Sequence, residues 1–542
     1  MEVGERGSFF LTFMSVTTYT LSLRLRKRCF FMEYAKNWRF HLFVAALTLF
    51  YGLAFTFSEF YGSPVSGVKD FFILSAQWGV VVAATYGLML LLALNRWVFV
   101  LLFTPMTLSC AVLTYFRYTA NITLTPMIIE LCLVNDVRTG LTLVDLPLIV
   151  VVLAALGISI VSIIIRFRYI TTPSLWPNLL GGLFVVALFN LFVPKLARPV
   201  SGRMPYSLYY NVKRYLSERA AISEKRTTFA DQPICVSDSM TVVLVIGESL
   251  RADHLQINGY GRETTPHLMQ DSLVVSFPHI YTEECFTHTS IPLMLTRADS
   301  VHPERAYTEP SFISLFKQAG YRTAWLANQG RVESYAYFMG ECDTLAYANS
   351  GKTSYVFGKW LDGDLLPLYD EELRRDEPRQ LILLHTIGSH WWYESHYTDE
   401  FRRYTPVIRS KVVSSCTDEE LVNSYDNTIL YSDLIWASLI DRLRDRMAVL
   451  IYLSDHGESL GEDGLYLHGV EHPTLRYPAC FVWTSERYAR KYPERVAALR
   501  ENSARHYRTD FLFHSILSGA DIRSGYIAGD LDIFSSLTDS LP

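Results

Sequence analysis

The first part of the chain is dominated by long apolar runs. Stretches of about 20 apolar residues recur over the first ~200 positions, and a helix of that length crosses about 30 Å of hydrocarbon. We therefore predict about five membrane-spanning helices, at roughly residues 41–58, 71–94, 98–116, 144–165 and 176–194. The alternative, buried helices of one large soluble core, agrees less well with the length of these runs and their scarcity of charge.

Basic residues flank the apolar runs on alternate sides. They precede the first run, lie between the second and third, and follow the fourth, as Arg24, Arg26, Lys27, Arg28, Lys36, Arg39, Arg96, Arg166 and Arg168. Such cations mark the cytoplasmic side, so five crossings place the chain after Pro194 on the outer side. Residues 1–31 fit neither a signal peptide nor a sixth span, because their basic cluster follows the apolar run, and Met32 is an alternative start to Met1.

The second part of the chain has the pattern of an α/β domain. From Met240 onward, short β-branched runs alternate with helix-like segments, as in "TVVLVIG", "RTAWLAN", "RQLILLHTIGSH", "MAVLIYLSDHGE" and "PACFVWTS". This alternation predicts a mainly parallel sheet covered by helices on both faces. We expect a membrane domain over residues 1–199, a connector with an interfacial helix over 200–235, and a catalytic domain over 236–542.

Three of these predicted strands end in ionisable residues. The first ends at Glu248, the third runs into His385 and His390, and the fourth ends at Asp455 and His456. Because sites in open α/β sheets form outside the carboxyl ends of the strands, these side chains should converge. Carboxylates combined with imidazole suit a catalytic divalent metal, zinc or manganese, with an open coordination position. We predict Glu248, Asp455 and His456 as its ligands.

A candidate nucleophile lies about forty residues after Glu248. The segment "EECFTHTSIPLMLTRA" opens a helix-like run, with Pro292 expected in its first turn. A hydroxyl at a helix N-terminus lies near exposed N–H groups, which favour a bound phosphate. Thr287 and Thr289 are both candidates on this ground, and ordinary N-capping is the alternative for each.

Composition narrows the possible partners. The net charge is −5 and the polar part has no basic tract, so nucleic acid is not expected as a partner.

Five of the eight cysteines lie in the outer part, namely Cys235, Cys285, Cys342, Cys416 and Cys480. No C-x-x-C pattern occurs, which argues against a structural zinc site.

Several motifs together resemble one known family. "VIGES", "CFTHTSIPLM", "WLANQ", "LHTIGSH", "YDNTILYSD" and "LSDHGESLGE" followed by "YLHG" resemble the lipid A and lipooligosaccharide phosphoethanolamine transferases, integral membrane members of the alkaline phosphatase superfamily. The resemblance implies an N-terminal helical membrane domain and a C-terminal alkaline-phosphatase-like α/β domain. It also implies that zinc is held by Glu248, Asp455, His456 and a threonine, which an ungapped match assigns to Thr287.

The resemblance implies further roles and a reaction. His390 and His468 match histidines near the transferred group, and His385 matches less closely. The implied donor is phosphatidylethanolamine and the implied acceptor a membrane glycolipid such as lipid A or the lipopolysaccharide core. The transfer would pass through a phospho-threonine intermediate at the periplasmic face of the inner membrane.

The chain also departs from the family's pattern. The family carries disulfides near its nucleophile, and only Cys285 and Cys342 lie in comparable neighbourhoods here. An acidic residue that contacts substrate has no clear counterpart between the third and fourth spans, where Glu130 and Asp136 are the candidates.

Three alternatives to a phosphoethanolamine transferase remain. A phosphoglycerol transferase would use a motif like the "GKTS" at residues 351–354, but here this motif lies in a polar loop roughly a hundred residues after Glu248 and not at the helix that carries the candidate nucleophile. A sulfatase-like hydrolase would need a C/S-x-P-x-R string, which is absent. A non-catalytic lipid-binding membrane protein would gain nothing from a cluster of ionisable groups that is costly to bury.

Overall fold

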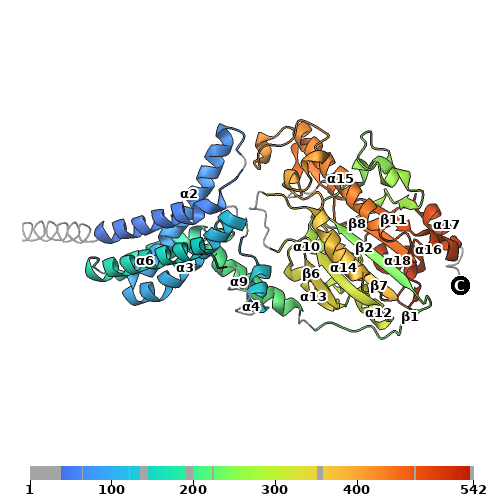
Figure 1. Cartoon of the computed structure of the whole chain (residues 1–542), viewed down its shortest axis with the longest axis horizontal. Coiled ribbons are helices and arrows are strands. Elements are labelled where there is room, and N and C mark those ends of the chain that lie inside the picture. Colours follow the sequence, from blue (N-terminus) through green and yellow to red (C-terminus); the bar gives the residue numbers. More distant parts are fainter. Residues whose placement is uncertain are drawn as a thin grey trace, which may run out of the picture. The chain divides into compact units, whose positions relative to one another are not determined.

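The computed structural model describes residues 38–63, 65–120, 123–134, 144–171, 173–189, 199–222, 225–350, 358–468 and 472–536 (Figure 1). The chain divides into two compact units. The first comprises residues 1–61, 72–120 and 137–210, and the second comprises residues 62–71, 121–136 and 211–542. Met32, Asp136 and the "GKTS" segment lie outside the described residues.

Long apolar helices build the first unit. Four helices of the described residues are long and apolar enough to cross a membrane, at Trp38–Glu59, α2 Val68–Leu94, α3 Arg96–Ala120 and α6 Leu146–Arg168. They correspond to the first four predicted spans. The fifth predicted span, 176–194, contributes the shorter apolar helix α7, Leu175–Ala187, and residues 190–198 lie outside the description.

A buried arginine joins two of these helices. Arg166, in the last turn of α6, is 1% exposed. Its Nε donates to the carbonyl of Ala93 over 2.8 Å and its Nη2 to the carbonyl of Leu94 over 3.3 Å. These carbonyls end α2 and lack partners within their own helix, so the guanidinium satisfies them and is itself satisfied.

A seven-stranded sheet organises the second unit. Its strand order is β3-β11-β8-β2-β7-β5-β6. The strands are β2 Met240–Gly247, β3 Val274–Ser276, β5 Arg322–Ala327, β6 Thr344–Tyr347, β7 Arg379–His385, β8 Ala448–Ser454 and β11 Cys480–Thr484. The five strands from β8 to β6 are parallel, and β11 is antiparallel to both of its neighbours. The predicted mainly parallel sheet is confirmed.

Helices cover both faces of this sheet (Figure 1). All eight residues of β2 are buried, and alternate residues of the strand contribute to two separate apolar clusters, as a two-residue period requires. The first cluster includes α10 Thr287–Leu295, α12 Phe312–Gln318, α13 Glu333–Glu341, α16 Glu486–Lys491, α17 Pro493–Asn502 and α18 Phe511–Gly519. The second includes α14 Leu366–Leu373 and α15 Asp418–Asp441.

Among the described residues, the other α-helices and strands are short, apart from one longer helix. That helix, α9, spans Tyr206–Ile222 and lies within the predicted connector. The others are α4 Pro126–Val134, α11 Arg305–Thr308, β1 Ile234–Cys235, β4 Ile280–Tyr281, β9 Ser459–Leu460, β10 Tyr466–Leu467, β12 Tyr507–Arg508 and β13 Ile522–Arg523.

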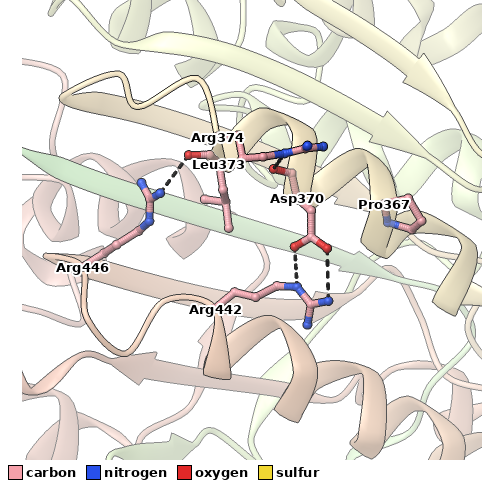
Figure 2. A pocket seen from close by; sticks show the side chains of 6 residues that line it. All are labelled: Pro367, Asp370, Leu373, Arg374, Arg442 and Arg446. Carbon is pink, nitrogen blue, oxygen red and sulfur yellow. Dashed lines mark hydrogen bonds and ion pairs between the residues drawn. The ribbon is translucent and has the colours of Figure 1, made fainter.

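An open pocket of about 650 Å³ lies between α14 and the segment after α15, close to the amino ends of β7 and β8 (Figure 2). Its guanidinium groups contact α14: Arg442 pairs with the carboxylate of Asp370, and Arg446 donates to the carbonyl of Leu373 over 2.8 Å (Figure 2). Because the arginines satisfy groups of one helix, the pocket is explained by local structure, and it lies away from the carboxyl ends of the strands.

Candidate metal centre

Strand pairing brings the predicted ligands together. β2 lies between β7 and β8 and is parallel to both. In this register Gly247, the last residue of β2, pairs with Ser454, the last residue of β8. The residues that follow, Glu248 and Asp455, therefore emerge side by side at one edge of the sheet, although 207 positions separate them in sequence.

The backbone at this edge is strained. Ser249, directly after Glu248, has a φ of +56°, a conformation uncommon for a residue with a side chain. Its N–H donates to Oδ1 of Asp455 over 3.0 Å, and its carbonyl accepts the hydroxyl of Tyr425 over 2.7 Å. These bonds hold the turn against its strain, which is typical of a functional site.

A glycine allows a second loop to approach Glu248. Gly388 has a φ of +49°, and a Cβ atom there would lie 2.8 Å from the carbonyl oxygen of Glu248. The N–H of Ser389 donates to that same carbonyl over 3.0 Å. The loop after β7 thus packs directly on the backbone of Glu248, and only glycine fits at its closest point.

Glu248, Asp455 and His456 form a buried cluster with the chemistry of a metal site. One ligand atom from each lies within 4.8 Å of the others, and the three residues are 1%, 0% and 0% exposed. Nε2 of His456 lies 3.4 Å from Oδ2 of Asp455 and 3.8 Å from Oε1 of Glu248. Nδ1 of His456 donates to the carbonyl of Gly457 over 2.7 Å, which leaves the lone pair of Nε2 facing the carboxylates.

Two atoms of this cluster lack a hydrogen-bond partner among the described residues. They are Oδ2 of Asp455 and Nε2 of His456. Buried polar atoms are nearly always satisfied, and a divalent cation would satisfy both atoms together. Oxygen and imidazole donors suit such a cation. The cluster is therefore a candidate divalent-metal site.

The electrostatics of the two carboxylates show what a cation would change. Burial raises the pKa of Asp455, and the charge of Glu248 raises it further. Burial also opposes ionisation of Glu248, but the neighbouring imidazoles of His390, His456 and His468 outweigh it and lower the pKa of that carboxyl. Two buried carboxylates repel each other when both are ionised, so a cation between them would favour the doubly ionised state.

Of the two candidate threonines, Thr287 contacts the cluster. It is the first residue of α10, and its hydroxyl donates to Oε2 of Glu248 over 3.0 Å. The hydroxyl of Thr289 instead donates to the carbonyl of Phe286 over 3.1 Å, at the start of its own helix. The sequence predicted Pro292 in the first turn of this helix, and that prediction is wrong: because α10 begins at Thr287, Pro292 lies in the second turn.

Two of the predicted histidines lie beside the cluster. The ring of His468 is centred 4.9 Å from that of His456 and 5.9 Å from that of His390. Nδ1 of His468 lies 3.4 Å from Oε2 of the buried Glu458. Burial opposes protonation of His468, but Glu458 and the two carboxylates of the cluster raise its pKa to about 9. His468 is therefore suited to hold a proton or an anionic group.

His385 has a different environment. It is fully buried at the end of β7, with its ring centred 6.0 Å from Trp325 and 5.6 Å from Tyr335. Burial lowers its pKa to about 4, so it is a neutral core residue. The structure does not bring its ring nitrogens into the cluster.

Sequence reasoning missed two side chains of the site. The amide of Gln329 donates to Oε2 of Glu248 over 2.9 Å and to the carbonyl of Thr386 over 2.7 Å. Glu458, the partner of His468, is fully buried. Two sequence signals could have identified them. Gln329 lies just after β5, which neighbours β7, and Glu458 lies two residues after His456.

The structure describes the cysteines and one of the two acidic residues at which the chain departs from the family's pattern. Cys285 and Cys342 form no disulfide with each other or with another described residue. Glu130 lies in α4, and Asp136 lies outside the described residues.

A family model agrees with this site. The sulfatase model matches residues 240–522, which is more than half of the chain and includes every predicted ligand. The chain belongs to the sulfatase family. The expected combination of apolar spanning helices with an alkaline-phosphatase-like α/β domain is confirmed.

Among its relatives, this sulfatase-family chain is similar to phosphoethanolamine transferases. Phosphoethanolamine transferase EptA of Escherichia coli strain K12 is 33% identical over 312 residues, which cover 54% of this chain and 55% of the relative. The chain thus matches about half the length of such curated relatives.

Two solved structures are similar to the second unit. The soluble domain of lipooligosaccharide phosphoethanolamine transferase A from Neisseria meningitidis is 29% identical with a TM-score of 0.52, covering 57% of this chain and 98% of that one. The C-terminal periplasmic domain of EcEptC from Escherichia coli, in complex with Zn, is 25% identical with a TM-score of 0.51, covering 57% and 90%. The expected resemblance to phosphoethanolamine transferases is confirmed.

Proposed function

We propose that this chain is a metal-dependent transferase that moves phosphoethanolamine from phosphatidylethanolamine to a membrane glycolipid. The observation that carries the proposal is the hydrogen bond of 3.0 Å between the Thr287 hydroxyl and Glu248, at a buried cluster in which two ligand atoms have no hydrogen-bond partner among the described residues. It unites a nucleophile, a candidate metal site and a helix N-terminus. The named activities of the relatives support it.

Zinc is the proposed metal, with manganese as the alternative. Glu248, Asp455, His456 and Thr287 would hold it, and the zinc in the similar EcEptC structure supports this choice. When bound, a divalent cation lowers the pKa of a coordinated hydroxyl and neutralises developing negative charge. Neighbouring backbone groups orient two of these ligands. The carbonyl of Gly457 fixes the tautomer of His456, and the N–H of Ser249 fixes one oxygen of Asp455.

In the first half-reaction, the Thr287 oxygen attacks the phosphorus of phosphatidylethanolamine. The Thr287 hydroxyl loses its proton as an O–P bond forms on its oxygen, the P–O bond to the glycerol breaks, and the glycerol oxygen takes up a proton, so that diacylglycerol leaves as an alcohol. Thr287 is the first residue of α10, and the exposed N–H groups of a helix N-terminus favour a bound phosphate. His468 or His390 would supply the proton or bind a phosphate oxygen.

In the second half-reaction, a hydroxyl or phosphate of the acceptor attacks the phospho-threonine. An O–P bond forms on the acceptor oxygen, which loses any proton it carries, the P–O bond to Thr287 breaks, and the Thr287 oxygen regains a proton. Lipid A or the lipopolysaccharide core is the proposed acceptor, supported by the lipooligosaccharide in the name of the Neisseria relative. Both substrates are amphiphiles, so attaching the catalytic domain, residues 236–542, to a membrane domain over 1–199 through a connector over 200–235 reduces the entropy lost when they meet.

The membrane context follows from the same substrates. We place the spanning helices in the inner membrane and the catalytic domain in the periplasm, where phosphatidylethanolamine and newly exported glycolipid are both within reach. The cations that begin α3 and end α6, Arg96 and Arg168, support this orientation.

Purified full-length protein and a fluorescent phosphatidylethanolamine test the proposal. With lipid A present, we expect release of fluorescent diacylglycerol and a lipid A species whose mass has increased by one phosphoethanolamine. Diacylglycerol release that does not need an acceptor, with free phosphoethanolamine as the second product, would instead indicate a sulfatase-like hydrolase. Loss of glycerophosphate from phosphatidylglycerol would indicate a phosphoglycerol transferase. No release with either lipid, from a zinc-loaded protein, would favour a non-catalytic lipid-binding protein.

A further inference from the structure

A short loop next to the metal cluster is held from two sides. It comprises residues 328–331 and connects β5 to α13. Its second residue, Gln329, donates to Oε2 of Glu248, the same oxygen that accepts the Thr287 hydroxyl. The position of this loop therefore bears on how the Glu248 carboxylate is oriented.

The inner side of the loop is fixed to the catalytic domain. The side-chain amide of Asn328 donates to Oδ1 of Asp362 over 2.8 Å, and the indole of Trp360 donates to the carbonyl of Asn328 over 2.8 Å. The hydroxyl of Tyr335 donates to the carbonyl of Gly330 over 3.0 Å. These bonds hold Asn328 and Gly330 from the inner side, whereas Arg331 at the end of the loop is held separately.

The outer side of the loop is fixed to α9. Nε of Arg331 donates to Oε2 of Glu218 over 3.1 Å. Nε of Arg214, one turn earlier on α9, donates to Oε1 of Glu218 over 2.8 Å, and its Nη2 donates to the carbonyl of Arg331 over 2.7 Å. Both oxygens of Glu218 are thus occupied, and both the side chain and the backbone of Arg331 are held.

The ion pair between the loop and α9 is buried. The side chains of Arg331 and Glu218 are 1% and 0% exposed, whereas that of Arg214 is 50% exposed. Removing one partner of a buried pair leaves an uncompensated charge, so the remaining partner moves or the segment shifts. Loss of Glu218 would therefore displace the loop, and a surface ion pair would have no such effect.

The carboxylate of Glu248 receives its orientation from these contacts. Oε1 accepts the hydroxyl of Ser249 over 2.8 Å, and Oε2 accepts both Gln329 and Thr287. A carboxylate offers about four lone-pair positions. With three of them engaged, the plane of the group is set before any cation binds, as supporting contacts do for metal ligands.

We propose that Glu218 and Arg331 are positioning residues that act on the metal site through Gln329. In this arrangement α9, which follows the spanning helices in sequence, clamps the loop of residues 328–331, and Gln329 transmits that position to Glu248. The link to catalysis rests on the proposed function, whereas the link to metal binding does not.

Zinc affinity of the full-length protein tests the clamp directly. We would measure it by competition with a chromophoric chelator for Gln329→Met, Glu218→Gln and the double variant. Each single change should weaken zinc binding by about 10-fold or more, as loss of a supporting contact does. The double variant should lose no more than the stronger single variant, because both changes break the same chain of contacts. Lys213→Gln, at an exposed position of α9, should bind zinc as the unchanged protein does.

Unchanged zinc affinity in Glu218→Gln would overturn the proposal, and so would losses that multiply in the double variant. If Glu218→Gln does not fold, Arg214→Met tests the same clamp from a half-exposed position. It removes the bond to the Arg331 carbonyl and should weaken zinc binding several-fold, and an unchanged affinity would again contradict the clamp. If the variants lose zinc affinity as expected but the unchanged protein transfers no phosphoethanolamine, the proposed function is overturned and the proposal about Glu218 and Arg331 still stands.

Discussion

The hydroxyl of Thr287 donates a hydrogen bond of 3.0 Å to Oε2 of Glu248, across 39 positions of sequence. The contact joins the start of α10 to the end of β2. It places a hydroxyl at the edge of a buried cluster of two carboxylates and an imidazole, which is the arrangement that a metal-activated nucleophile requires.

Removal of this hydroxyl should abolish transfer. Thr287→Ala should lower kcat/KM for diacylglycerol release by roughly 10³-fold or more, since loss of a nucleophile removes the covalent pathway. Thr289→Ala is the matched control, because its hydroxyl bonds to Phe286 within the same helix, and it should retain most of the activity. If Thr289→Ala is the inactive variant and Thr287→Ala is not, the nucleophile has been assigned to the wrong residue.

Removal of a metal ligand should lower metal content. Asp455→Asn and His456→Gln each remove a ligand atom that has no other partner among the described residues, so both should lose stoichiometric zinc after dialysis. Elemental analysis by mass spectrometry of the purified protein measures this loss. His302→Gln changes an exposed histidine and should keep its zinc. A full complement of zinc in both ligand variants would show that the metal binds elsewhere.

A methyl group at Gly388 should disturb Glu248. Alanine there would need a strained positive φ and would overlap the Glu248 carbonyl. Gly388→Ala should therefore destabilise the domain by about 2 kcal/mol or more and weaken zinc binding. Gly259→Ala has a comparable φ of +93° but open space around the new atom. It should cost about 1 kcal/mol and leave zinc affinity unchanged. Equal zinc affinities for the two variants would count against the close packing on Glu248.

Acid should destabilise the protein through His514. This residue of α18 is 7% exposed, its Nδ1 accepts the N–H of Ala528 over 3.1 Å, and burial lowers its pKa to about 4. The unfolded chain binds the proton near the ordinary pKa of about 6.5. Stability from His514 is therefore complete above pH ~6.5 and is lost as the pH falls towards 4, by up to about 1.4 kcal/mol per pH unit.

The variant His514→Gln removes the contribution of this histidine to the pH dependence of stability. Thermal unfolding of the full-length protein between pH 7 and pH 4 should show a smaller fall in midpoint for the variant than for the unchanged protein. Parallel curves for the two proteins would mean that His514 is not buried in its neutral form.

Much of the site could be predicted because parallel strands impose a simple geometry. Runs of β-branched residues marked β2, β7 and β8, and their shared direction placed Glu248 and Asp455 at one edge. The turn at Gly457 then allowed His456 to face the same point. The full strand order was not needed, but the adjacency of β2 and β8, which the sequence does not reveal, is what places the two carboxylates side by side.

Other features depend on contacts that leave no pattern in sequence. Thr287 and Thr289 lie two positions apart, and only the residue at which α10 begins decides which hydroxyl faces Glu248. Gln329 carries no charge, so nothing but the pairing of β5 with β7 brings it to the site. His385 ends a strand as Glu248 nearly does, yet its ring turns into the core between Trp325 and Tyr335.

The measurement that tests the account most directly is the identification of the covalent intermediate. Full-length protein would be incubated with phosphatidylethanolamine in the absence of acceptor, stopped with acid, digested and analysed by mass spectrometry. We predict one peptide that carries phosphoethanolamine on Thr287, which disappears when lipid A is added before the stop. An adduct on another residue, or active protein that never carries an adduct, would contradict the account.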